Sequence, residues 1–305
     1  MDNLTHTLTG FVLSRAGLGR STPGATLALV LASNLPDIDI VFGLQSTAAY
    51  LEHHRDISHS VFGAPLLALA LAGVLRLTLR RARFVPLLLC SLLGVSVHVF
   101  MDLWTSYGTR VLAPLDRTFY TWDLVFIVDP LILLVLLGTL LACLRLPQPA
   151  RIAALGLGLV LSYVGARAVL HMQAVEEGIA RVPGVGIVKA AALPSPLEPF
   201  RWRFLADTGS AYWTGEVSLR EPATALRRRE KVPESAVVTR ARESSGVAST
   251  FLAFSTFPWF EVAPSEGGME VVFRDLRFER PGQDSFAARV LVGPDGSIRR
   301  ETFRF

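Results

Sequence analysis

The chain has 305 residues, of which 51% are hydrophobic and only 18% are charged, and its formal net charge is +4. An ordinary soluble domain carries about 25% charged residues, so this composition and a mean hydropathy of +0.42 indicate a membrane protein. The only two cysteines, Cys90 and Cys143, lie inside apolar runs, which excludes a disulfide framework and a cysteine-based zinc site.

Long apolar runs fill the first half of the chain, whereas residues 173–305 hold most of the Arg and Glu. Each run is close to the roughly 20 residues that cross a bilayer core, so we expect an α-helical bundle of four or five spans. A short helix over about 4–18 precedes them. The start MDNLTH lacks the basic region of a cleavable signal peptide, and we expect it to be retained. The apolar runs are residues 24–44, 61–75, 84–104, 124–144 and 152–170.

Arginines gather in the connections 76–83 and 145–151, and cytoplasmic loops of membrane proteins carry such an excess of basic residues. Alternation of the spans then places 43–60, 105–123 and everything after about 171 on the extracytoplasmic side. The basic residues therefore report membrane topology, and no nucleic-acid partner is expected.

The last part of the chain reads as a soluble domain. Short runs rich in Val, Phe, Trp and Arg, bounded by Gly, Pro, Asp and Ser, predict strands, and the turn residues 293–297 predict a hairpin between Ala288–Val292 and Ile298–Phe305. The polar stretch 222–247 predicts a surface helix with a loop. We expect a membrane-embedded helical domain over 1–171 and an extracytoplasmic, β-rich (α+β) domain over 172–305. The other predicted strands are 201–206, 211–219, 269–278 and 287–293.

Histidine and aspartate concentrate in the apolar half: five of the six histidines lie within the first 102 residues. An ionisable residue inside a span is costly unless it is paired or coordinated, so it is a functional candidate by default. His98 and Asp102 are four apart and share one helix face, which suits a metal site. The alternative is a hydrogen-bonded pair that only joins two helices.

Asp37 and Asp39 follow Pro36 at the end of the first long apolar run. Proline biases the preceding residue toward an extended conformation, and a broken helix end of this kind can present both carboxylates to one polar cavity. The alternative is a pair of carboxylates that lies in the headgroup region.

Three more histidines complete the candidate set. His54 and His59 flank Arg55 and lie on the same predicted side as the aspartates; as alternatives, they are exposed loop residues, which is most credible for the neighbouring His53. His6 lies on the short first helix, where a single histidine is otherwise a packed core residue.

Carboxylates mixed with imidazoles and no thiolate suit Zn²⁺, and also Mn²⁺ or Fe²⁺. Because seven ligands exceed the three protein ligands of one catalytic zinc, the site can hold one to three ions. Such ions activate a water and clamp the oxygens of a phosphoester, and Arg55 offers a fork of donors to phosphate. We assign Arg55 and Asp102 to catalysis. The predicted ligands are His6, Asp37, Asp39, His54, His59, His98 and Asp102.

These residues predict a metal-dependent hydrolase of a phosphodiester or ester, with a lipid or another small molecule as substrate and membrane lipid as a partner. A metal-ion or proton transporter is an alternative, but it needs polar residues toward the cytoplasmic side, and residues 62–75, 84–95 and 131–144 offer almost none. A non-catalytic protein with a structural metal would show a closed coordination shell.

The order of the motifs MDNLTHTLTG, NLPDID, HRDISHS and HVFMDLWTSYGT resembles the YdjM-like family of bacterial inner-membrane proteins. These are described as metal-dependent hydrolases distantly similar to zinc-dependent phospholipase C and S1/P1-type nucleases. The resemblance covers residues 1 to about 135. It implies an inner-membrane location, the seven ligands above, Arg55 beside them and Asp129 as a further carboxylate. Because His53 adjoins His54, the motif leaves open which of the two coordinates.

Overall fold

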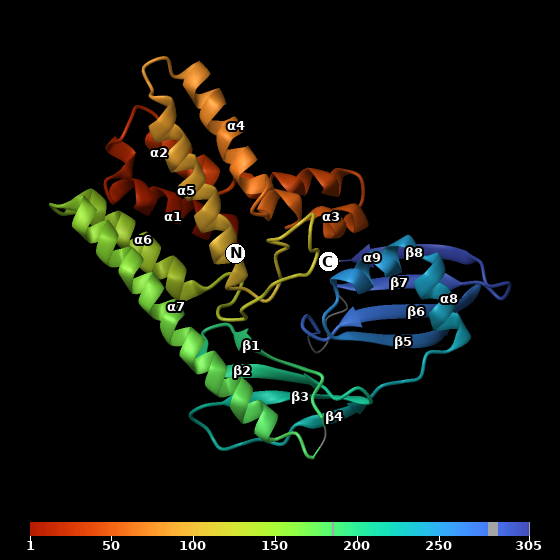
Figure 1. Ribbon diagram of the computed structural model, residues 1–305. Helices are drawn as coiled ribbons and strands as arrows, with labels where there is room; N and C mark the ends of the chain where they lie inside the picture. The colour runs from red at the N-terminus through yellow and green to blue at the C-terminus, as the bar shows by residue number, and fades with distance from the viewer. Residues whose placement is uncertain (185, 280–285, 305) are drawn as a thin grey trace.

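The computed structural model describes residues 1–184, 186–279 and 286–304. A helical N-terminal region is followed by two four-stranded sheets, and the long helix α7 leads from the bundle to the first sheet (Figure 1). The helices of the N-terminal region are α1 Asn3–Arg15, α2 Ala25–Ala32, α3 Thr47–His53, α4 Gly63–Thr78, α5 Phe84–Leu103, α6 Pro130–Arg145 and α7 Pro149–Ala180, with the 3-10 helices η1 Leu18–Arg20, η2 Leu35–Leu44 and η3 Ile57–His59.

The predicted count of four or five spans is not confirmed. Within the described ranges, α5 and α7 are each long and apolar enough to cross a membrane, and the number rises to four if each of two bent helix pairs forms one span. Helix α6 is a shorter apolar helix, because Asp129 caps its first turn and the preceding residues form an irregular segment.

Both bent pairs carry predicted site residues. Helices α2 and η2 meet at 47°, and the segment Thr47–His59 meets α4 at 75°. The expected extended segment around Asp37 is a 3-10 helix instead, since Pro36 lies in its first turn, where proline needs no intrahelical donor. Irregular backbone in membrane proteins is tolerated where it lines a polar cavity, and residues of both breaks line a pocket.

A close contact between α5 and α2 fixes the position of the site along these two helices. A Cβ added at Gly94 would lie 2.5 Å from the Cβ of Ala32 and 3.0 Å from the carbonyl oxygen of Leu29. The missing side chain lets the two backbones approach, as small residues do in membrane helix pairs. One turn further along α5, His98 reaches the end of α2.

The C-terminal domain consists of antiparallel sheets, as predicted, with strand orders β1-β2-β3-β4 and β5-β6-β7-β8. The predicted hairpin is present, with Ala288 paired to Phe303. The prediction for 222–247 was wrong in part, because Arg227–Glu230 forms edge strand β4, where charged side chains stay solvated and block further pairing. The elements are β1 Lys189–Ser195, β2 Glu198–Asp207, β3 Ala211–Ser218, β4 Arg227–Glu230, α8 Ala236–Ser244, α9 Gly246–Phe254, β5 Pro258–Ser265, β6 Gly268–Asp275, β7 Ala287–Val292 and β8 Ile298–Arg304.

The first sheet is fastened to α7. Buried Arg167 donates from Nε to the carbonyl oxygen of Leu124 at 2.8 Å, and its guanidinium carbon lies 3.9 Å from the ring centroid of Trp202. Near the end of α7, Gly178 leaves space for Phe204 of β2, whose ring atoms would lie 2.2 Å from an added Cβ. The helix thus continues well past residue 171 as a support for the sheet.

The second sheet reaches the loop after α5 through one buried arginine. Arg277 forms an ion pair with Asp275 at 2.8 Å and donates to the carbonyl oxygens of Ser106 at 2.9 Å and Phe254 at 3.2 Å. Leu51 of α3 packs in the same hydrophobic cluster as strands β6, β7 and β8. The sheet therefore touches two segments that carry or border the predicted site.

Arg277→Met is expected to destabilise the C-terminal domain by about 3–5 kcal/mol, because it leaves the Asp275 carboxylate buried without its partner. Tryptophan-fluorescence melting at pH 7 will measure the loss. As a control, Arg242→Met removes a half-exposed ion pair with Glu234 and should change the stability by no more than about 1 kcal/mol. Equal melting temperatures for both variants would contradict a structural role for Arg277.

Acid should destabilise the same domain. Burial raises the pKa of Asp275, but the opposing charge and hydrogen bonds of Arg277 outweigh burial and hold that pKa below its usual value. A carboxyl whose pKa is depressed in the folded state stabilises the fold above its unfolded pKa of about 3.9 and loses this contribution as the pH falls through the folded value. The melting temperature of the wild type is expected to drop below about pH 4. In Arg277→Met the guanidinium is gone and only two backbone N–H groups still oppose the effect of burial on Asp275, so acidification should cause a smaller drop.

Candidate metal centre

The seven predicted side chains come together where α1, α5 and the two helix breaks meet. Two groups of side chains each offer ligand atoms that lie within 4.8 Å of one another. Asp37 belongs to both groups, so it would be a ligand common to both sites if two ions were bound. The first group is Asp37, His59, His98 and Asp102, and the second is Asp37, Asp39 and His54.

Five of the six distances among the four ligand atoms of the first group match the edges of a coordination tetrahedron, and the sixth is within 4.8 Å. Two ligands that each lie 2.0–2.1 Å from a tetrahedral zinc are about 3.4 Å apart. From His59 Nε2 the distances are 3.1 Å to His98 Nε2, 3.4 Å to Asp37 Oδ1 and 3.3 Å to Asp102 Oδ2. From His98 Nε2 they are 3.6 Å to Asp37 Oδ1 and 3.4 Å to Asp102 Oδ2. The residues present therefore fit an ion of zinc's size.

Hydrogen bonds at Nδ1 turn the imidazoles toward this centre. His98 Nδ1 donates to the carbonyl oxygen of Ser33 at 2.7 Å. Ser58 donates its hydroxyl to Asp39 at 2.8 Å and can accept from His59 Nδ1 at 2.9 Å. With Nδ1 protonated in both rings, the two Nε2 lone pairs face each other, an arrangement that a shared cation stabilises. Such outer hydrogen bonds fix the tautomer of metal-binding histidines.

The second group is organised around Asp39, which is 4% exposed. Its carboxylate accepts hydrogen bonds from His54 Nδ1 at 2.8 Å and from the backbone N–H of Arg55 at 2.9 Å. A carboxylate that holds Nδ1 of a histidine leaves Nε2 for a metal. Asp39 thus orients His54. Its carboxylate also offers a ligand atom that lies within 4.8 Å of those of Asp37 and His54.

Asp102 is the most densely contacted carboxylate of the site and is fully buried. Its Oδ1 contacts the α-amino group of Met1, Arg55 Nη2 at 2.9 Å and His6 Nε2 at 3.4 Å. Its Oδ2 lacks a hydrogen-bond partner among the described residues and faces the two Nε2 atoms. Oδ1 is therefore paired with cationic groups of the chain, and Oδ2 remains available to a metal ion.

His6 lies beside the two groups and belongs to neither. Its ring stacks on that of His98 with 3.9 Å between centroids, and it is fully buried. Both ring nitrogens lack a hydrogen-bond partner within the part of the chain that the structure describes. His6 thus contacts two members of the first group, and its role as a ligand stays a prediction.

Arg55 occupies the opening of the site with a left-handed backbone, φ 59°. Besides Asp102, its guanidinium contacts Thr105, with Nη1 donating to Oγ1 at 3.3 Å. The guanidinium carbon lies 5.0 Å from the ring centroid of Tyr107. Tyr107 in turn lies 5.0 Å from the ring of Phe254 in the C-terminal domain. Arg55 thus links the cluster to Tyr107, which packs against the C-terminal domain.

Sequence reasoning missed several neighbours of the cluster. Asn3 donates from Nδ2 to Asp37 Oδ2 at 3.2 Å, and Tyr50 stacks on His54 with 4.5 Å between centroids. Met1 and Asn3 stand in the opening motif, and Tyr107 stands in the motif that contains Asp102, so the motifs held a signal for these three. Tyr50 carried no such signal.

Two residues near the motifs lie outside the two groups. The ring of His53 is tilted against that of Phe42 with 4.3 Å between centroids, and the structure places His54, and not His53, in the cluster. Asp129 caps α6 by accepting from the N–H groups of Leu131 and Ile132 at 3.0 and 3.1 Å. This capping role explains the carboxylate that the family resemblance marked as a further metal-site position.

Comparison with known proteins gives two matches. A family model described as YdjM inner membrane protein matches residues 1–174. The protein YfhP of Bacillus subtilis (strain 168), described as uncharacterized, is 29% identical over 311 residues, which cover 98% of this chain and 93% of YfhP. No solved structure matches. Neither match carries a hydrolase name, so the similarity to phospholipase C and to nucleases stays a prediction.

Proposed function

We propose that the chain, which belongs to the YdjM inner membrane protein family because the family model matches more than half of it, is a membrane-bound metal-dependent hydrolase of a phosphodiester or ester. The observation that carries the proposal is the set of four ligand atoms, five of whose six separations lie between 3.1 and 3.6 Å, beside an arginine that lines a pocket. A site that only fastened helices would need neither the arginine nor the pocket.

Asp37, His59, His98 and Asp102 would hold a first ion, and Asp39 and His54 would hold a second ion that shares Asp37. Zn²⁺ suits this donor set best, with Mn²⁺ or Fe²⁺ as alternatives. A bound ion of this kind supplies a water of lowered pKa and polarises the ester oxygen. Arg55 would bind the phosphate oxygens and orient the phosphorus toward the cluster.

Metal analysis of the full chain purified in detergent tests this proposal, together with a chromogenic phosphodiester and carboxylic ester panel. We expect one or two equivalents of a divalent ion, loss of hydrolysis after chelation, and recovery when Zn²⁺, Mn²⁺ or Fe²⁺ is added back. Hydrolysis that persists at its full rate after complete removal of metal would contradict the proposal.

We also propose that the second domain lies outside the cytoplasm, on the basis of the arginine-rich connections 76–83 and 145–151. Alkaline phosphatase fused after Phe305 should then be active, whereas a fluorescent reporter that requires the cytoplasm should be dark. The same reporters inserted between Arg80 and Arg81 serve as the matched control and should give the opposite pattern. Cytoplasmic activity of the fusion after Phe305 would reverse the orientation.

A further inference from the structure

We infer that the substrate of this site is an amphiphilic phosphate ester, whose phosphate binds at Arg55 and whose alkyl chain lies along an apolar wall of the adjoining pocket. The inference rests on the proposed function and names its substrate class. The pocket has a volume of about 620 Å³, within the range of roughly 300–1,000 Å³ that small-molecule sites occupy.

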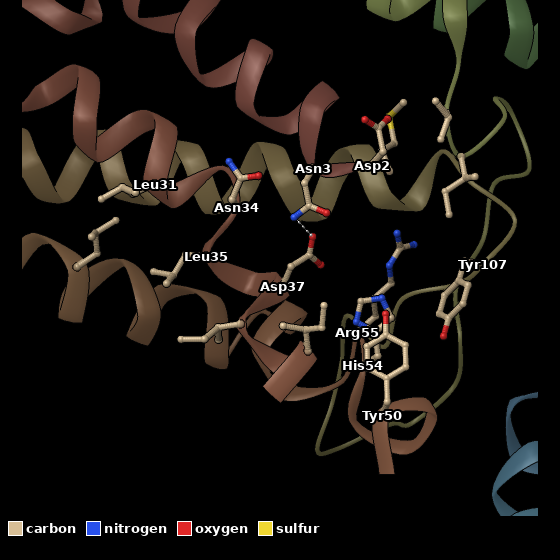
Figure 2. Close-up of a pocket in the computed structure, with 16 residues that line it drawn as sticks. Asp2, Asn3, Leu31, Asn34, Leu35, Asp37, Tyr50, His54, Arg55 and Tyr107 are labelled. Carbon is tan, nitrogen blue, oxygen red and sulfur yellow. Dashed lines mark hydrogen bonds between the residues drawn. The ribbon is translucent and has the colours of Figure 1, made fainter. Parts of the chain in front are cut away.

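The pocket is polar at one end and apolar at the other. Figure 2 shows His54, Arg55 and Tyr107 at one end, and Leu31 and Leu35 with Asn34 toward the other. A ligand that fills the pocket therefore meets the cationic group at one end and mostly apolar side chains at the other. We call the apolar side chains from α2, η2 and α4 the apolar wall, which consists of Leu31, Leu35, Ile38, Ile40 and Leu71.

The polar end retains a free donor for an anion. The two terminal nitrogens of Arg55 contact Asp102 and Thr105, whereas its Nε has no hydrogen-bond partner among the described residues. The residue is only 2% exposed, and a buried N–H without a partner is costly. A phosphate oxygen of the substrate would satisfy this donor.

The apolar wall continues onto the outer surface of the bundle. Leu31, Ile38 and Ile40 are 43%, 51% and 65% exposed although they line the pocket. They belong to the bent pair α2 and η2, which is apolar enough to form one membrane span, so their exposed parts face lipid in the bilayer. An alkyl chain can therefore pass from the bilayer into the pocket sideways without crossing water.

The reaction on such a substrate is a hydrolysis that balances with water alone. The oxygen of water bonds to phosphorus, the bond from phosphorus to the alcohol oxygen breaks, and that oxygen takes a proton from the water. The product that keeps the alkyl chain returns to the bilayer along the apolar wall, and the other product leaves through the polar end.

Chain length provides the test. Butyl, hexyl and octyl esters of p-nitrophenyl phosphate will be hydrolysed by the metal-loaded full chain, and kcat/KM is expected to rise about fourfold for each methylene that the wall buries, since a buried CH₂ contributes about 0.8 kcal/mol. In a second arm, binding of octylphosphonate to the metal-free chain is measured by calorimetry and should exceed that of butylphosphonate and of inorganic phosphate.

Variants of the wall localise the effect. Ile38→Ser and Leu71→Ser should each reduce the ratio between the octyl and butyl esters, and Leu71→Ala replaces Leu71→Ser if that variant does not fold. Leu44→Ser is the matched control, because Leu44 lies on the same 3-10 helix as Ile38, is 90% exposed and does not line the pocket. It should leave the ratio unchanged.

These measurements distinguish failure of the amphiphilic substrate from failure of the proposed function. Equal kcat/KM for all chain lengths, with equal binding of octylphosphonate and inorganic phosphate, would overturn the amphiphilic substrate and leave metal-dependent hydrolysis intact. Absence of metal binding and of hydrolysis of every ester would overturn the proposed function. Binding of octylphosphonate that still depended on chain length and on Leu71 would then support the pocket as a lipid site without that chemistry.

Discussion

His98→Ala and Asp102→Ala will each lower the affinity for the bound ion by at least about 100-fold while the helices remain inserted. Loss of an outer partner already costs 10–100-fold in metal affinity, and these changes remove direct ligands of a four-atom centre. Each side chain also lies at three or more of the short distances in the cluster. Metal content after gel filtration, at matched helicity by circular dichroism, is the measurement.

His53→Ala is the matched control for this pair. The ring of His53 packs against Phe42 and lies outside both groups of ligands, so the variant should keep its metal. If His98→Ala and Asp102→Ala also keep the full stoichiometry, the two side chains only join α5 to neighbouring segments, as the hydrogen bond from His98 to Ser33 does, and are not metal ligands.

Arg55→Lys is expected to lower kcat/KM for a phosphodiester by about 100–1,000-fold with the metal retained. A preorganised donor to developing charge contributes about this much, and an ammonium cannot reproduce the planar fork of the guanidinium. The lysine charge still faces Asp102, so the carboxylate is not left alone in the buried site. Steady-state kinetics and metal content on the same preparation will separate the two effects.

Arg117→Lys is the control for this change. Arg117 is half exposed, pairs with Asp56 at 3.3 Å and does not line the pocket. Lysine keeps a positive charge beside the buried carboxylate of Asp56, so this variant should leave kcat/KM within about threefold. A wild-type rate in Arg55→Lys would reduce Arg55 to an ion-pair partner of Asp102.

Local sequence patterns predicted the features whose geometry is set by residues close together in the chain. The four-residue spacing of His98 and Asp102 placed both on one face of α5, where the structure has them. The turn residues 293–297 marked the hairpin of β7 and β8. In each case residues close in sequence set the geometry.

Other features depend on contacts between distant segments, and no local pattern reports them. Pro36 predicted a break in the apolar run 24–44, but no local pattern reports the 47° bend by which Asp37 reaches residues of α5. The run of arginines in β4 looked like a helical surface, but its pairing with β3 decides its conformation. Tyr107 is positioned by its contact with the C-terminal domain. The sequence motif around Tyr107 does not report this contact.

The hydrogen bond from Arg277 to the carbonyl oxygen of Ser106 joins positions 171 residues apart, and this separation imposes an order on biosynthesis. A ribosome that adds about 5–20 residues per second needs roughly 10–30 seconds to pass from one to the other. During that interval the bundle can insert and its histidines can meet, but the loop that carries Tyr107 lacks its anchor. The newborn chain therefore completes the outer edge of its site last, after the second sheet has been made.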